Sequence, residues 1–116
     1  MKKVLVVEDN DSSCLLLTFI LRSHYEFARA KNGQEAVDMA QAGGFDLILM
    51  DLKMPVMDGL EATRKIKAVF PNLPIIALTA NAFDNDREHA FEAGCDDFLS
   101  KPVSSEKCLE VIAKFI

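Results

Sequence analysis

Five polar side chains stand at the ends of short apolar runs in this 116-residue sequence, and their types limit the chemistry that the chain can perform. They are Glu8, Asp9, Asp51, Thr79 and Lys101. Carboxylates that lie close together repel one another, and a bound cation removes that repulsion. Mg²⁺ binds oxygen ligands, keeps several waters and is typically held by one or two carboxylates together with a phosphate. A fold that gathers these side chains would therefore form a magnesium site that is open on one side.

The apolar runs predict buried strands, and the segments between them predict helices. Strands are expected at residues 4–7, 25–30, 46–50, 75–79 and 97–100. Helices are expected at residues 33–42 and at roughly 84–93. Three more are expected to follow a cap: the first has its cap within 10–13 and ends at 21, the second has its cap at 58 and ends at 69 or 70, and the third has its cap at 104 or 105 and ends at 115 or 116. The mixed pattern of residues 25–30 favours an edge strand.

Strict alternation of strands and helices predicts an α/β fold, in which helices cover both faces of a parallel sheet. In such a sheet, ligands bind beyond the carboxyl ends of the strands, where the strand order reverses. The residues that end the strands are therefore the candidate site residues. If the first and third strands are neighbours, Asp9 and Asp51 lie side by side.

Composition favours one folded domain and argues against two classes of partner. The net charge is −5 and the longest basic cluster is Lys2-Lys3, so direct binding of nucleic acid is not expected. The longest strongly apolar stretch, residues 14–21, is far below the ~18 residues of a membrane span. The apolar run at the N-terminus is too short for a signal peptide, so a cytoplasmic protein is expected. Three cysteines without a C-x-x-C pair predict free, buried thiols.

Several landmarks in order along the chain resemble the response-regulator receiver domain. They are Glu8-Asp9, Asp51, the segment DLKMPVMDG that begins at Asp51, Thr79-Ala80 and Lys101-Pro102. The resemblance covers essentially the whole chain. It implies a flavodoxin-like, doubly wound sheet of five parallel strands in the order 2-1-3-4-5, with five helices. Residues 1–116 would then be a single receiver domain, with no output domain in this chain.

The resemblance also implies a role for each carboxylate. Asp51 would be the phosphoacceptor and would form an acyl phosphate. Asp9 and Asp51 would bind Mg²⁺ directly, and Glu8 would act through a metal-bound water. The backbone carbonyl of Lys53 would be a further metal ligand.

The remaining landmarks would bind the phosphoryl group and respond to it. Thr79 and the backbone N–H of Ala80 would donate hydrogen bonds to it, and Lys101 would pair with it. Phe98 stands at the family's switch position: as Thr79 moves inward, Phe98 would enter the vacated space. That movement would alter the surface of the fourth helix, the fifth strand and the fifth helix. Phe98 lacks the hydroxyl of a tyrosine, so an output contact that needs this hydroxyl is not available.

The function implied is a phosphorylation-controlled signalling receiver, which catalyses only its own phosphorylation and dephosphorylation. Its donor would be a sensor histidine kinase or a histidine phosphotransfer protein, and its downstream partner would be another protein. The alternative is a receiver module of a hybrid histidine kinase or of a longer response regulator, acting as a phosphorelay intermediate. A monomer or a weak, phosphorylation-linked dimer is expected.

Two other functions fit the sequence less well. A flavin-binding module needs a hydroxyl- and glycine-rich loop after the first strand, but Glu8 and Asp9 would repel a phosphate there. An aspartyl phosphatase usually carries a second aspartate two residues after the nucleophile, where this chain has Lys53. In isolation Asp51 could instead be a helix cap, but Asp58 is better placed for that.

Two positions near the predicted site remain open in the sequence. Lys53 stands two residues after Asp51, and Asn81 stands two residues after Thr79. In the family, the side chains at these two positions face the attacking water. An amine at Lys53 that shields the phosphoryl group would slow self-hydrolysis. Pro102, directly after Lys101, predicts a cis peptide bond at a tight turn.

Overall fold

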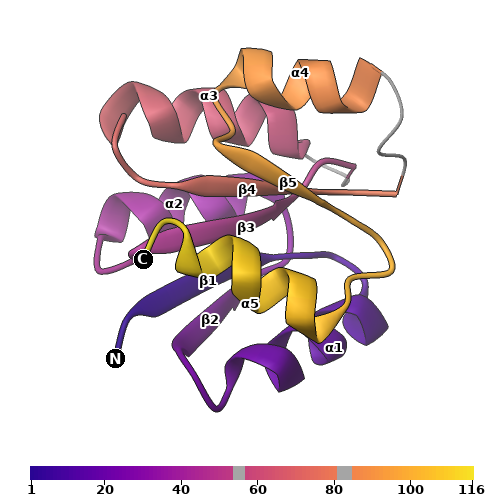
Figure 1. The fold of residues 1–116 in the computed structure, drawn as a ribbon. Coiled ribbons are helices and arrows are strands. Elements are labelled where there is room, and N and C mark those ends of the chain that lie inside the picture. Colours follow the sequence, from indigo (N-terminus) through magenta and orange to yellow (C-terminus); the bar gives the residue numbers. More distant parts are fainter. Residues whose placement is uncertain (54–56, 81–84) are drawn as a thin grey trace.

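The structure is a computed structural model that describes residues 1–53, 57–80 and 85–116. Five strands alternate with five helices in this part of the chain (Figure 1). The strands are β1 (Lys3–Val7), β2 (Glu26–Ala30), β3 (Leu47–Asp51), β4 (Ile75–Thr79) and β5 (Asp97–Ser100). The helices are α1 (Asp11–Leu21), α2 (Gly33–Ala42), α3 (Gly59–Val69), α4 (Asn85–Ala93) and α5 (Ser105–Ala113). The predicted alternation is confirmed.

The sheet is parallel throughout and has the order β2-β1-β3-β4-β5, as the resemblance implied. β2 lies at the edge, and its first two residues are exposed, which confirms the edge position predicted from its mixed pattern. The chain passes from β1 to β2 on one side and then returns to β3 on the other. The strand order therefore reverses between β1 and β3, and the carboxyl ends of these two strands are neighbours.

The core forms two layers, one on each face of the sheet. Leu5 and Val7 of β1 belong to the layer that includes residues of α2, α3 and α4. Val4 and Val6 belong to the layer that includes residues of α1 and α5, and Figure 1 shows how the helices flank the sheet. Successive residues of a strand point to opposite faces. Central strands covered on both faces therefore need continuous apolar runs, which explains the sequence pattern.

The observed boundaries differ from the predicted ones at a few ends. β3 ends one residue later than predicted and includes Asp51, which is in register with Leu78 of β4. α5 ends at Ala113, although Phe115 and Ile116 beyond it still pack against the core. The predicted start of the fourth helix at residue 84 and the position Asn81 lie outside the described residues.

Side-chain caps begin the helices that follow the strands. Asn10, Asn32, Asp58 and Ser104 each accept a hydrogen bond from the backbone N–H three residues further on. Asp58 is therefore the cap of α3, and Asp51 is left available for another role. The Lys101-Pro102 peptide bond is cis, as predicted.

The cysteines agree with the expectation of free, buried thiols. Cys14, Cys95 and Cys108 are free and buried. Burial raises the pKa of the Cys95 and Cys108 thiols to about 11, which keeps them protonated near neutral pH.

None of the helices in residues 1–53, 57–80 and 85–116 has the length and apolarity needed to span a membrane.

Candidate functional site

Three carboxylates meet where the strand order reverses. Glu8 and Asp9 follow β1, Asp51 ends β3, and one oxygen of each lies within 4.8 Å of the others. Glu8 is fully buried and Asp51 is 6 % exposed, whereas Asp9 is open to solvent. The expected proximity of the Asp9 and Asp51 side chains is confirmed. The cluster has one open side, and the exposed Asp9 lies there.

The backbone around Glu8 holds its side chain inward. The Glu8 N–H donates to the Ala30 carbonyl of β2 over 3.1 Å, which extends the strand pairing past the end of β1. One carboxylate oxygen, Oε1, accepts a hydrogen bond from the Asn10 N–H at 3.2 Å. The other, Oε2, lies 2.8 Å from the Lys101 ammonium. Glu8 is thus a fully buried carboxyl group that depends on a few polar neighbours.

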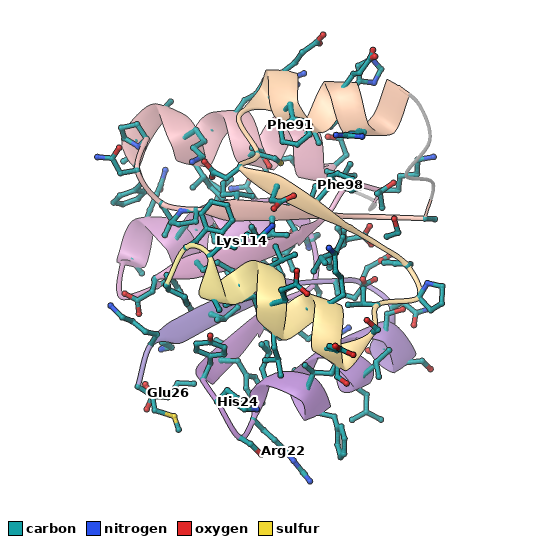
Figure 2. All side chains as sticks on the ribbon, in the orientation of Figure 1. Arg22, His24, Glu26, Phe91, Phe98 and Lys114 are labelled. Carbon is teal, nitrogen blue, oxygen red and sulfur yellow. The ribbon has the colours of Figure 1, made fainter. Side chains whose placement is uncertain are left out.

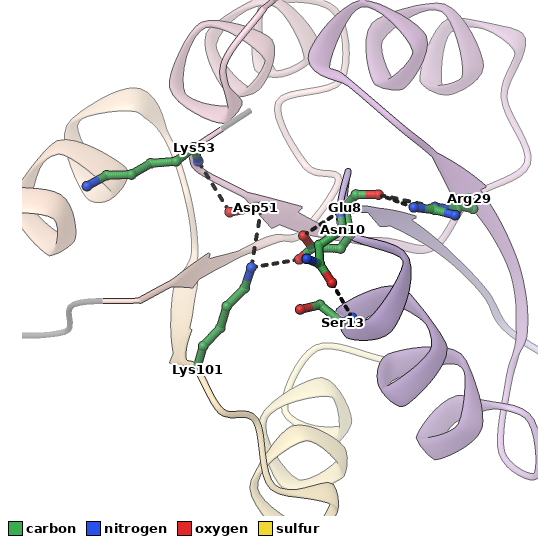
Figure 3. A network of polar contacts seen from close by, with 7 residues as sticks. All are labelled: Glu8, Asn10, Ser13, Arg29, Asp51, Lys53 and Lys101. Atoms are coloured by element: carbon green, nitrogen blue, oxygen red, sulfur yellow. Dashed lines mark hydrogen bonds and ion pairs between the residues drawn. The ribbon is translucent and has the colours of Figure 1, made fainter. Parts of the chain in front are cut away.

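Lys101 brings a positive charge to the cluster from the end of β5. Its Nζ lies 2.8 Å from Glu8 Oε2 and 3.4 Å from Asp51 Oδ2 (Figure 3). Its backbone N–H donates to the Thr79 carbonyl over 2.8 Å, which fixes the chain before the cis peptide. The resemblance implies that Lys101 pairs with a phosphoryl oxygen, and in this structure it pairs with Glu8 and Asp51.

These contacts shift the pKa values of both partners. Burial raises the pKa of the Glu8 carboxyl; the Lys101 ammonium opposes this shift, and the charge of Asp51 adds to it. Burial by itself would lower the pKa of Lys101, but its contacts with Glu8 and Asp51 outweigh burial and raise that pKa. Lys101 is therefore held in its charged form beside Asp51.

The backbone on both sides of Asp51 keeps this residue rigid. Asp51 Oδ1 accepts a hydrogen bond from the Lys53 N–H at 3.2 Å. The next residue, Leu52, donates to the Leu78 carbonyl at 3.2 Å and accepts from Gly59 at 3.1 Å. The first residue of α3 is thus tied to the end of β3. A Cβ at Gly59 would lie 2.1 Å from the Asp51 carbonyl oxygen, so this approach requires glycine.

A cavity of about 240 Å³ lies over the carboxylates. The predicted metal and phosphoryl residues all line it: Glu8, Asp9, Asp51, Lys53, Thr79, Ala80 and Lys101. Sequence reasoning treated Asn10 and Ser13 only as cap candidates, and both also line this cavity. Thr79 is buried at the end of β4, next to Ser100 in register. Figure 3 shows the Lys53 side chain extending away from Asp51.

Phe98 does not line this cavity and lies on the face of β5 that packs against α4. Its ring meets the ring of Phe91 edge to face, with centroids 6.2 Å apart, and Figure 2 shows the two side by side. The guanidinium of Arg87 lies 4.8 Å from the Phe98 ring centroid. Phe98 is half-buried and packs against the core layer of α2, α3 and α4. The contact with Arg87 was not predictable from the sequence, because it depends on how α4 packs against β5.

A family model described as "Response regulator receiver domain" matches residues 4–113. The chain belongs to this family. Its fold and the acidic cluster at the strand ends agree with that membership, and it is a receiver domain of two-component signalling. The recognition and the fold class expected from the sequence are both confirmed.

Similar proteins include a response regulator and the receiver domain of a sensor histidine kinase. The polar-differentiation response regulator DivK of Brucella anthropi is 38% identical over 99% of this chain and 96% of its own. The receiver domain of sensor histidine kinase PA1611 from Pseudomonas aeruginosa PAO1, solved with a magnesium ion in the active-site cleft, is 38% identical, with a TM-score of 0.93 over 98% of this chain and 96% of its own. The receiver domain of Saccharomyces cerevisiae Ssk1, solved with the histidine phosphotransfer protein Ypd1, is 36% identical, with a TM-score of 0.92. The match covers 98% of this chain and 88% of that one.

The residues at the site fit the Mg²⁺ that receiver domains bind. All three clustered acidic ligands are hard oxygen donors, which Mg²⁺ prefers. Glu8 Oε2 is buried, and no described residue gives it a well-formed hydrogen bond, although the Lys101 ammonium lies close to it. Three carboxylates against one ammonium leave an excess of negative charge that a divalent cation would neutralise.

Proposed function

We propose that residues 1–116 form a single receiver domain that accepts a phosphoryl group on Asp51 in a Mg²⁺-dependent reaction. The observation that carries this proposal is the position of Asp51. Its carboxylate ends a central strand, is 6 % exposed, and lies 3.4 Å from the Lys101 ammonium beside two further carboxylates. A rigid nucleophile flanked by a fixed cation is what phosphoryl transfer requires.

The chain's own residues account for most of the transfer. An oxygen of Asp51 forms the new O–P bond as the bond from phosphorus to the donor's imidazole nitrogen breaks, and that nitrogen leaves with the electron pair. Lys101 can turn from Glu8 and Asp51 toward the phosphoryl oxygens as the charge there increases. The Thr79 hydroxyl and the Ala80 N–H stand at the end of the neighbouring strand as hydrogen-bond donors.

Asp9, Asp51 and the Lys53 carbonyl would hold Mg²⁺, with Glu8 acting through a bound water. The ion would supply positive charge to the phosphoryl oxygens. The acidic cluster and the magnesium site of the similar PA1611 receiver support this assignment.

The proposed donor is a sensor histidine kinase or a histidine phosphotransfer protein in the cytoplasm. The similarity to the Ssk1 receiver, solved with its phosphotransfer protein Ypd1, supports this class of donor. The chain is 38% identical both to DivK and to the receiver domain of a sensor kinase. We therefore propose two settings for it: a separate response regulator, or a phosphorelay intermediate within a longer protein.

Intact-mass measurement after incubation with a small acyl-phosphate donor tests this function. One added phosphoryl group is expected with Mg²⁺, and none when the metal is removed by EDTA. No adduct with several donors in Mg²⁺ would contradict the proposal. Continuous turnover of phosphate esters would indicate a phosphatase instead.

Phosphorylation is proposed to switch the surface formed by α4, β5 and α5 through Thr79 and Phe98, and a downstream protein would bind there. Arg87 and Phe91 of α4 hold the Phe98 ring in this structure. A cation–π contact contributes about 0.5–1 kcal/mol at an exposed site, so Arg87→Ala should raise the population with Phe98 turned inward about two- to fivefold. NMR of labelled phenylalanine during beryllofluoride titration would measure this population.

The matched control for the Arg87 variant is Arg22→Ala. It removes a similar contact, in which Arg22 Cζ lies 4.6 Å from the Phe19 ring centroid on α1. This variant should leave the Phe98 signals unchanged. Equal titration curves for Arg87→Ala and the wild type would show that the arginine does not hold the ring.

The role of Lys53 stays a prediction. Its side chain is exposed and extends away from Asp51 in this structure, so shielding of the phosphoryl group requires the amine to swing back (Figure 3). If it does, phosphorylated Lys53→Ala should lose phosphate faster than the wild type. Lys107→Ala, which removes an exposed amine on α5, should decay at the wild-type rate. Decay that is unchanged or slower in Lys53→Ala would exclude shielding.

A further inference from the structure

We propose that Arg29 of β2 is a positioning residue for the magnesium site, because it fixes the backbone of the β1–α1 loop. This inference rests on the proposed Mg²⁺-dependent function. The Arg29 side chain donates two hydrogen bonds to the Glu8 carbonyl, from Nε at 3.1 Å and from a terminal nitrogen at 3.0 Å (Figure 3). The other terminal nitrogen lies 2.8 Å from Asp11 Oδ1, in the first turn of α1.

The group that Arg29 holds is the peptide unit between two metal-site carboxylates. The carbonyl of Glu8 belongs to the peptide bond that leads directly to Asp9. The N–H of Glu8 is already bonded to Ala30 of the same edge strand. β2 therefore binds both backbone groups of Glu8: the Ala30 carbonyl accepts from its N–H, and the Arg29 guanidinium donates to its carbonyl. This fixes where the Asp9 side chain leaves the loop.

The fork geometry is specific to arginine. A guanidinium presents rigid, planar donors, so one side chain can hold a carbonyl with two nitrogens and a carboxylate with a third. The Arg29 side chain is 24 % exposed, so its contacts with the loop are partly shielded from water. The Asp11 side chain is 88 % exposed, so the ion pair by itself contributes little. The bonds to the Glu8 carbonyl are the part that matters for the metal.

Positioning and charge make opposite predictions for this residue. The positive charge of Arg29 repels a cation that approaches the acidic cluster, so its removal would by electrostatics alone strengthen Mg²⁺ binding. Loss of the two hydrogen bonds would free the loop and weaken binding. The direction of the change therefore separates a positioning role from a purely electrostatic one.

The experiment measures the Mg²⁺ dissociation constant from backbone amide shifts in NMR titrations of the wild type, Arg29→Met and Arg29→Lys. We expect Arg29→Met to bind Mg²⁺ on the order of tenfold more weakly, as is typical when a group that orients a metal ligand is lost. Arg29→Lys keeps the charge and one bond to the carbonyl, and should fall between the two. The weakening should persist when NaCl is raised from about 0.05 to about 0.5 M, where exposed charges are screened.

Asp11→Asn is the matched control. It removes the ion pair with Arg29 and leaves both bonds to the Glu8 carbonyl, so its Mg²⁺ affinity should stay within about twofold of the wild type. Urea unfolding in EDTA gives the stability of each variant, and affinities are compared for proteins that are fully folded.

Two results would overturn the positioning role. One is Mg²⁺ binding by Arg29→Met that equals or exceeds that of the wild type, and the other is an Asp11→Asn loss as large as that of Arg29→Met. Failure of the wild type to bind Mg²⁺ would instead overturn the proposed function on which the inference rests.

Discussion

The Asp51→Asn variant should take up no phosphoryl group from an acyl-phosphate donor under conditions in which the wild type takes up one. An amide is a far weaker nucleophile than a carboxylate, and the change also removes one charge of the metal cluster. The loss should therefore be complete within detection, as measured by intact mass after incubation with the donor and Mg²⁺.

Asp58→Asn is the control for this loss. It makes the same chemical change at the start of α3 and keeps a good N-cap there, where Asp58 Oδ1 accepts a hydrogen bond from the Glu61 N–H at 2.9 Å. This variant should be phosphorylated like the wild type. Urea unfolding should show that both variants are folded. Phosphoryl uptake by folded Asp51→Asn would place the acceptor elsewhere.

The Gly59→Ala variant should be destabilised by about 3 kcal/mol, an effect at the upper end for overpacking. The added Cβ would lie 2.1 Å from the Asp51 carbonyl oxygen and 2.8 Å from Leu52 Cα, both backbone atoms that cannot move without disturbing the strand end. Alanine is the better helix former by about 1 kcal/mol, so a loss of stability would show that the close approach outweighs propensity. Urea unfolding followed by circular dichroism measures the change.

Gly44→Ala separates this steric effect from the loss of glycine's conformational freedom. Gly44 has φ +94° and nothing within 4 Å of its added Cβ, so only backbone strain is expected there, about 1 kcal/mol. If Gly59→Ala were as stable as the wild type, or cost no more than Gly44→Ala, α3 would not be tied to Asp51 as tightly as the structure shows.

The sequence was sufficient to predict the convergence of the site because of strand polarity. In a parallel sheet every strand presents its carboxyl end to the same edge, so strict alternation of strands and helices brings Glu8, Asp9, Asp51, Thr79 and Lys101 together. The adjacency of β1 and β3 came from the family resemblance, since local patterns do not set the order of strands. The structure confirms both.

Features that depend on side-chain reach were not predictable from the sequence. The pattern of residues 25–30 predicts an edge strand, but the bonds of the Arg29 guanidinium to the Glu8 carbonyl depend on the path of a loop one strand away. In the same way, the contact of Arg87 with Phe98 depends on the crossing of α4 over β5. Long side chains choose among several partners within reach, and only the assembled fold determines which partner is available.

Borohydride trapping of the phosphorylated protein, followed by mass analysis of its peptides, directly identifies the residue that accepts the phosphoryl group. Borohydride reduces an aspartyl phosphate to homoserine and leaves free carboxylates unchanged, so it marks the residue that carried the phosphoryl group. We predict homoserine at position 51 alone, and only when donor and Mg²⁺ are both present. Reduction at Asp9, at Asp58 or at any other carboxylate, with none at Asp51, would contradict it.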